Sequence, residues 1–138
     1  WGKEFVRIDG FNDGGSWFIG IFPLEKAGRY VGFFHAESHW DLSGTAHKSI
    51  GVVYSDDYGA TWHDPKPIIT DKSPKPAKPD WTGLGDGCVI WDSANSALHL
   101  LLSRQSGRWG QHPLHGSLFR CERCSGNLEE MGRRGLYA

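Results

Sequence analysis

The chain is poor in several features that identify common classes of protein. It has no apolar run of ~18 residues, so the sequence offers no candidate for a membrane-spanning helix. Its formal net charge of −1 gives no support for binding to nucleic acid or to a charged membrane surface. Three cysteines are too few for a disulfide scaffold and leave the cellular compartment open. Helical periodicity is confined to NLEEMGRR in the C-terminal part.

Glycine, tryptophan and short apolar runs are abundant instead. Nineteen glycines and seven tryptophans in 138 residues are typical of a single all-β domain with many turns. Clusters of Gly, Pro, Asp or Ser separate the apolar or alternating runs, which is the signature of strands and turns. The predicted strands are residues 16–22, 29–36, 49–55, 61–69, 87–92 and 97–103. The Pro/Lys-rich segment 71–81 is expected to be an extended connector.

One turn between two of these strands has a defined pattern, Ser-x-Asp-x-Gly-x-Thr-Trp. Gly59 supplies the positive φ that a tight turn needs. Ser55 and Asp57 can bond backbone N–H groups of the same turn through their side-chain oxygens. Thr61 and Trp62 then open the next strand, with a large ring free to pack beneath the hairpin. The pattern predicts a hairpin whose loop satisfies its own polar groups.

A weak internal repeat relates two parts of the chain. Residues 12–22 and 84–92 both place Asp-Gly before an apolar run, and a second strand follows each. Four strands per unit are typical of a β-propeller blade of ~40–50 residues. Residues 1–104 would then form about one and a half to two antiparallel blades, whereas a closed propeller needs at least ~4. The chain starts at Trp1 without Met or a signal-like segment, so we expect a trimmed or partial product. Its uncovered strand edges favour self-association.

The turn carries a resemblance to a known family. SDDYGATW, residues 55–62, resembles the Asp-box of sialidases and other β-propeller glycoside hydrolases. The pattern GRYVGFFHAESHW…SIGVVYSDDYGATW…GLGDGCVIWD is similar to secreted bacterial proteins of the five-bladed propeller glycosidase superfamily, over about residues 12–104. The resemblance implies an extracellular or periplasmic glycoside hydrolase that acts on a polysaccharide or glycoconjugate without a cofactor. It also implies that the Asp-box is a structural turn at the outer edge of a blade. A non-catalytic carbohydrate-binding or structural propeller is the alternative.

Titratable side chains end one of the predicted strands. In FFHAESHW the strand period of two places Phe33, His35, Glu37 and His39 on one face. In the resembled enzymes such a strand end can face the central pocket, and a hydrogen-bonded cluster at a blade rim is the alternative. His-x-Glu-x-His on a strand can also supply metal ligands, but no further ligand set is evident.

Two aspartates are candidates for the second carboxyl group of a hydrolase. Asp86 lies between glycines, which leave its carboxylate uncrowded, and Asp13 holds the equivalent place in the preceding unit. Glycoside hydrolysis needs one protonated and one ionised carboxyl group. Glu37 with Asp86 or Asp13 would supply this pair at ~5–9.5 Å, with His35 within hydrogen-bond reach. A turn role beside glycine is the alternative for each aspartate, and it is favoured for Asp13.

Further residues are candidates for substrate binding. Aromatic side chains can stack on sugar rings, although core or turn packing is their commoner role. Trp17 belongs to this aromatic group. The predicted substrate-binding residues are Asp13, His39, Trp40 and Trp81.

The tail, residues 105–138, allows two interpretations. Four residues with the spacing His-x2-His-x5-Cys-x2-Cys can hold a tetrahedral zinc ion. These are His112, His115, Cys121 and Cys124. The alternative is a frame shift between about residues 101 and 121, because GNLEEMG read one nucleotide later allows the Gly-Thr-Trp strand opening that the second unit lacks. We favour the frame shift, which predicts a tail without a native fold, no convergence of these four side chains and no metal.

Overall fold

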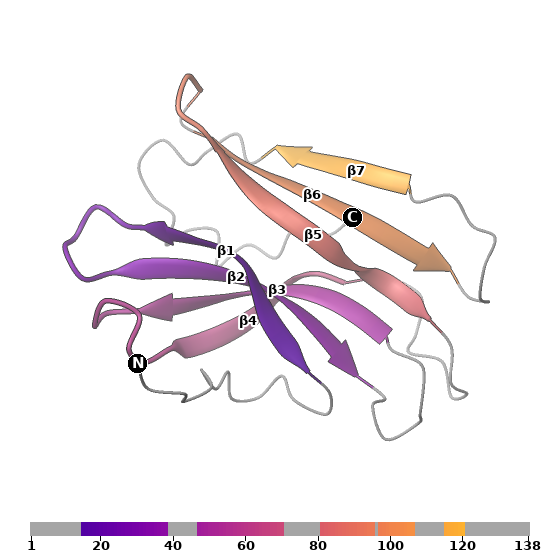
Figure 1. Ribbon diagram of the computed structural model, residues 1–138, viewed down its shortest axis with the longest axis horizontal. Coiled ribbons are helices and arrows are strands. Elements are labelled where there is room, and N and C mark those ends of the chain that lie inside the picture. Colours follow the sequence, from indigo (N-terminus) through magenta and orange to yellow (C-terminus); the bar gives the residue numbers. More distant parts are fainter. Residues whose placement is uncertain (1–14, 39–46, 71–80, 96, 107–114, 121–138) are drawn as a thin grey trace.

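The computed structural model describes residues 15–38, 47–70, 81–95, 97–106 and 115–120. Within these residues the chain is all β, and seven strands form one open, mixed sheet (Figure 1). No helix in the described ranges is long and apolar enough to cross a membrane. The strands are β1 (Ser16–Pro23), β2 (Tyr30–Ser38), β3 (His47–Ser55), β4 (His63–Ile69), β5 (Thr82–Asp92), β6 (Ala97–Ser106) and β7 (His115–Arg120).

The strand order shows one crossover. The strands pair in the order β1-β2-β3-β5-β6-β7, and β4 also pairs with β3. The first four strands form an antiparallel meander in chain order, and so do the last three. β3 and β5, however, run parallel where Lys48 lies opposite Gly83, so the expectation of purely antiparallel pairing is wrong here. The reason is that β4 ends beside Ile50, and β5 then enters the sheet next to the first residues of β3 and runs in their direction.

All six runs predicted from the sequence form strands. The largest difference is at β5, which begins at Thr82 rather than at residue 87. Glycines make this early start possible, because a Cβ at Gly83 would overlap the backbone carbonyl of Lys48 on β3. β7 lies inside the tail, residues 105–138, and its backbone pairs with β6. The rest of that tail after Ser106 lies outside the described residues, so its interpretation stays a prediction.

Side chains pack on both faces of β2 and β3. Phe33 belongs to the larger buried cluster, which includes residues of β3, β4, β5 and β6. Phe34 belongs to a smaller cluster on the opposite face, with Trp62 packed against it. This alternation is the one that the strand period predicts for FFHAESHW. Gly51 makes the second cluster possible, since a Cβ there would overlap the ring of the fully buried Phe34.

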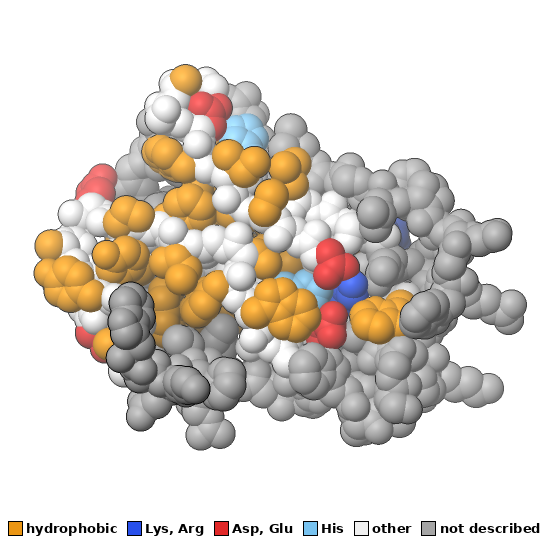
Figure 2. Space-filling model, in the orientation of Figure 1, with side chains coloured by type: hydrophobic (Ala, Val, Ile, Leu, Met, Phe, Trp, Pro, Cys, Tyr) orange, Lys and Arg blue, Asp and Glu red, His pale blue; other side chains and the backbone are white. Residues whose placement is uncertain are grey.

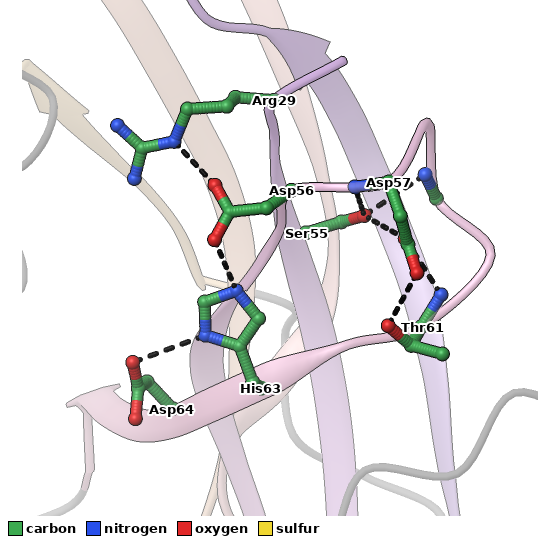
Figure 3. Close-up of polar contacts among 8 residues, drawn as sticks. Arg29, Ser55, Asp56, Asp57, Thr61, His63 and Asp64 are labelled. Atoms are coloured by element: carbon green, nitrogen blue, oxygen red, sulfur yellow. Dashed lines mark hydrogen bonds and ion pairs between the residues drawn. The ribbon is translucent and has the colours of Figure 1, made fainter.

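The turn at residues 55–62, called the Asp-box turn after the motif that it resembles, joins β3 and β4 as the sequence predicts. Its Ser55, Asp57 and Thr61 side chains bond one another and the backbone of the turn (Figure 3). The buried Ser55 hydroxyl donates to Asp57 Oδ1 at 2.8 Å and accepts the N–H of Gly59 at 2.9 Å. Asp57 Oδ1 also accepts the N–H of Thr61 at 2.8 Å. Gly59 has φ +85°, and Trp62 packs beneath it on the sheet. These bonds hold the loop between β3 and β4 together from within.

A second set of contacts fastens this turn to its neighbours. The N–H of Tyr58 donates to the carbonyl of Gly28 in the β1–β2 turn. Asp56 accepts from Arg29 and contacts His63, as Figure 3 shows. Because all of these residues are at the Ser55 end of β3, the Asp-box ties together the same ends of β1 to β4.

Acid should weaken the Asp-box in a specific pH range. The pKa of Asp57 is lowered to about 2, first by the hydrogen bond from the Thr61 hydroxyl and then by the N–H of Thr61 and the Ser55 hydroxyl. The pKa of Asp57 in the folded state lies below the unfolded value of ~3.9. The ionised carboxylate therefore makes its full contribution to the free energy of unfolding above pH ~3.9, and this contribution is lost as the pH falls toward 2. Thermal unfolding between about pH 6 and pH 2 should show wild type more stable than Asp57→Asn at high pH, with the difference shrinking toward pH 2. A pH-independent difference would contradict this assignment.

Candidate functional site

A cluster of titratable side chains lies at the other end of β3 from the Asp-box. His35 and Glu37 come from β2, Lys48 from β3 and Asp86 from β5. Antiparallel pairing sets Glu37 opposite Lys48, and the parallel crossover sets Lys48 opposite Gly83, three residues before Asp86. Ser55 comes seven positions after Lys48 along β3, a strand length of ~23 Å. The separation supports a structural role for the Asp-box.

Asp86 projects from an irregular segment of β5. The register between β5 and β6 shifts between Gly85 and Cys88, which marks a β-bulge. Asp86 has φ +49°, a left-handed conformation that is uncommon for residues other than glycine. Bulges and unfavourable backbone angles are found often beside active sites, where they direct a side chain. Here they turn Asp86 toward β2 and β3.

His35 connects Asp86 to Glu37. Its ring is fully buried, and Nδ1 accepts the backbone N–H of Asp86 at 2.8 Å. Because Nδ1 is an acceptor, the proton of the neutral ring is on Nε2, which donates to Glu37 Oε1 at 3.1 Å. Burial lowers the pKa of His35, against the opposing effect of the Glu37 hydrogen bond, and so favours this neutral form. The His35 ring therefore fixes both the backbone of Asp86 and the carboxylate of Glu37.

Lys48 balances the charge of Asp86. Its ammonium group contacts Asp86 Oδ2, and only 5% of the lysine side chain is exposed, against 45% for Asp86. The same ammonium lies 5.1 Å from the centre of the Trp81 ring, in cation–π geometry. The Lys48 charge is therefore held between a carboxylate and an indole. Sequence reasoning missed Lys48, because only the register of β2, β3 and β5 brings it to the site.

Asp86 brings the cluster to the surface. Figure 2 shows acidic, basic and histidine side chains gathered at one place, with hydrophobic side chains beside them. Asp86 is the most exposed of the titratable residues, whereas Glu37 is buried. A ligand approaching from solvent would therefore meet Asp86 first.

The same three side chains also carry atoms that can bind a metal ion. His35, Glu37 and Asp86 each offer a ligand atom, and the three atoms lie within 4.8 Å of one another. A metal on Nε2 of neutral His35 would require the proton on Nδ1, where the N–H of Asp86 already donates. Lys48 also occupies one oxygen of Asp86. The arrangement of hydrogen bonds fits proton transfer better than metal binding.

The structure brings together the main residues predicted for the site. His35, Glu37 and Asp86 converge, and one oxygen of each acid lies within 4.8 Å of the other, which is shorter than the expected ~5–9.5 Å. Trp81 lies next to them through Lys48. Three predicted substrate-binding residues, Asp13, His39 and Trp40, lie outside the described residues. Of the proposed zinc ligands, His112, Cys121 and Cys124 also lie outside them, and only the backbone of His115 is described.

Gly85 gives His35 its space. A Cβ at this position would overlap the Cε1 and Nδ1 atoms of the buried ring. We expect Gly85→Ala to lower the free energy of unfolding by about 1–3 kcal/mol, since the ring cannot move without losing its bonds to Asp86 and Glu37. Urea denaturation measures this loss, and proton NMR should show that the slowly exchanging Nε2–H signal of His35 disappears. Ser93→Ala, in the exposed turn after β5, is the control. Wild-type stability with an intact Nε2–H signal would refute the close contact.

Comparison of the chain with protein-family models, with curated proteins and with solved structures gives no match. The functional assignment therefore depends on the sequence patterns and on the geometry of the site.

Proposed function

We propose that the chain is part of a secreted, propeller-type glycoside hydrolase that acts on a polysaccharide or glycoconjugate. The observation that carries this proposal is the convergence of two carboxyl groups, Glu37 and Asp86, on one histidine whose tautomer is fixed. The bulge at Asp86 adds support, because bulges are found often beside active sites. The meander of β1 to β4, with the Asp-box at its far end, is compatible with a propeller blade.

The environment of each carboxyl group suggests its role. Glu37 is buried and is positioned by the hydrogen bond that His35 donates to Oε1, and we assign to it the transfer of a proton to the glycosidic oxygen. Asp86 is exposed and paired with Lys48, a position suited to an ionised carboxylate. It would act on the anomeric carbon directly or through a water molecule. His35 is a positioning residue, because it holds both acids without facing the solvent.

The proposal is tested by hydrolysis. The purified chain, and any longer natural protein that contains it, should be incubated with arabinan, xylan, galactan and a sialylated glycoprotein. Release of reducing ends or free sialic acid from at least one substrate is expected, and it should depend on Glu37. A protein that cleaves none of these in either form would refute the hydrolase assignment.

A non-catalytic carbohydrate-binding propeller is the second candidate. The favouring observation is that both acids are already engaged by protein groups, Glu37 by His35 and Asp86 by Lys48. In this case the same substrates would bind without being cleaved.

Edge strands are common to both candidates: β1 and β7 each pair on one side only among the described residues. Self-association through such edges is therefore part of the proposal, and light scattering that shows a stable monomer would count against it.

A further inference from the structure

Trp17 on β1 is placed to extend the site. Its backbone pairs with His35 across the β1–β2 ladder. The two rings stack at a centroid distance of 4.3 Å with 18° between their planes. His35 is fully buried, whereas 43% of Trp17 is exposed. The indole therefore covers the imidazole that joins the two acids and still presents a large surface to solvent.

A second indole lies beyond the acids. Trp81 contacts the ammonium of Lys48, which in turn contacts Asp86. The order of contacts is thus an indole, the histidine with its two carboxyl groups, the lysine and another indole. Figure 2 shows hydrophobic side chains beside the polar ones on this face. An exposed indole such as that of Trp17, beside polar groups, suits a ligand that has both an apolar face and hydroxyl groups.

The charges of the cluster select among such ligands. Lys48 balances the negative charge of Asp86, and His35 is neutral. Glu37 adds a negative charge when it is ionised. Of the described arginines, Arg29 is committed to Asp56 near the Asp-box, ~23 Å away along the strands. Arg104 on β6 lies opposite Leu84, two residues before Asp86, but Lys48 is the cation that contacts Asp86. An anionic sugar would meet the exposed carboxylate of Asp86 and be repelled by it. A neutral sugar ring meets no such repulsion.

We infer that Trp17 is the stacking platform of a subsite for neutral sugars, with the apolar face of the ring on the indole and its hydroxyl groups directed to Asp86. The inference rests on the proposed function, since it names the substrate class of the same site. It assigns Trp17 to binding rather than to the chemical step. The sequence alone placed this tryptophan only among several that might stack on sugars or fill the core.

The test compares two tryptophans of equal exposure. Trp17→Ala removes the platform, and Trp91→Ala is the matched control, because Trp91 on β5 is 45% exposed. Trp91 lies five residues beyond Asp86, ~16 Å along the strand. Arabinotriose, xylotriose and galactotriose serve as neutral probes, and 3′-sialyllactose and trigalacturonate as anionic ones. Intrinsic fluorescence and saturation-transfer NMR follow binding to the full chain.

At least one neutral trisaccharide should bind more tightly than both anionic probes. Trp17→Ala should weaken this binding by about tenfold or more, Trp17→Phe should restore part of it, and Trp91→Ala should leave it within about twofold. Wild-type affinity in Trp17→Ala, no binding of any neutral probe, or tighter binding of an anionic probe would overturn the inference. A loss of fold in Trp17→Ala is recognised by its NMR spectrum, and Trp17→Phe then decides the question.

The outcome separates this inference from the hydrolase proposal. If the wild type binds through Trp17 but cleaves nothing, the subsite stands and the hydrolase assignment fails. If the wild type cleaves a neutral glycan and Trp17→Ala has an unchanged KM, the hydrolase stands and the platform fails.

Discussion

Glu37→Gln is expected to lower kcat on a cleaved glycan by about 10³-fold while the fold is retained. General acid catalysis by a positioned side chain contributes ~10²–10⁴-fold, and an amide cannot donate the required acidic proton. The fold should survive because the amide oxygen of glutamine can still accept the Nε2–H of His35, which bonds Glu37 Oε1 at 3.1 Å. Initial rates and a thermal unfolding curve measure the two effects.

The control for this variant is Glu25→Gln, in the exposed turn after β1. It removes the same charge far from His35 and should leave kcat unchanged. Normal turnover in Glu37→Gln would exclude Glu37 as the proton donor. A variant that unfolds would instead show that the carboxylate is needed for the cluster itself, and the assignment of its catalytic role would also fail.

Asp86→Asn is expected to destabilise the protein by about 2–3 kcal/mol, in addition to any loss of turnover. The change leaves the ammonium of Lys48, which is 5% exposed, without its opposite charge. Asparagine is the right substitution because it tolerates the left-handed backbone of Asp86, so strain is not altered. Urea denaturation measures the effect. The ion pair of Arg29 and Asp56 serves as the comparison. Asp56→Asn should lower the free energy of unfolding by less than Asp86→Asn does, because the Asp56 side chain is more exposed.

A double-mutant cycle with Lys48→Met tests the cause of this loss. Methionine keeps much of the apolar stem but removes the charge, so the double variant should be at least as stable as Asp86→Asn alone. Additive losses would mean that Lys48 and Asp86 do not interact. The cycle also separates activity from stability. If Asp86→Asn and the folded double variant both lose turnover, the loss lies in the chemical step and is not caused by unfolding.

Only part of the candidate site could be predicted from the sequence. Strand alternation is a local property, so it placed His35 and Glu37 on one face before any pairing was known. The glycines beside Asp86 were expected to leave its carboxylate uncrowded, whereas in the structure Gly85 makes room for the His35 ring at a bulge. Lys48 and the contact between Trp17 and His35 had no local signal. They depend on which residues face each other across β1, β2 and β3.

The sequence by itself determined the all-β class, the position of six strands and the Asp-box turn. Each depends on interactions within a few residues, namely alternating burial, turn-forming glycines and the short hydrogen bonds between Ser55, Asp57 and Thr61. Only the tertiary structure decided that β5 runs parallel to β3. This pairing joins residues far apart in the chain, and its register depends on how the two faces of β2 and β3 are buried. That single crossover brings Asp86 to Lys48, His35 and Glu37, and so creates the site.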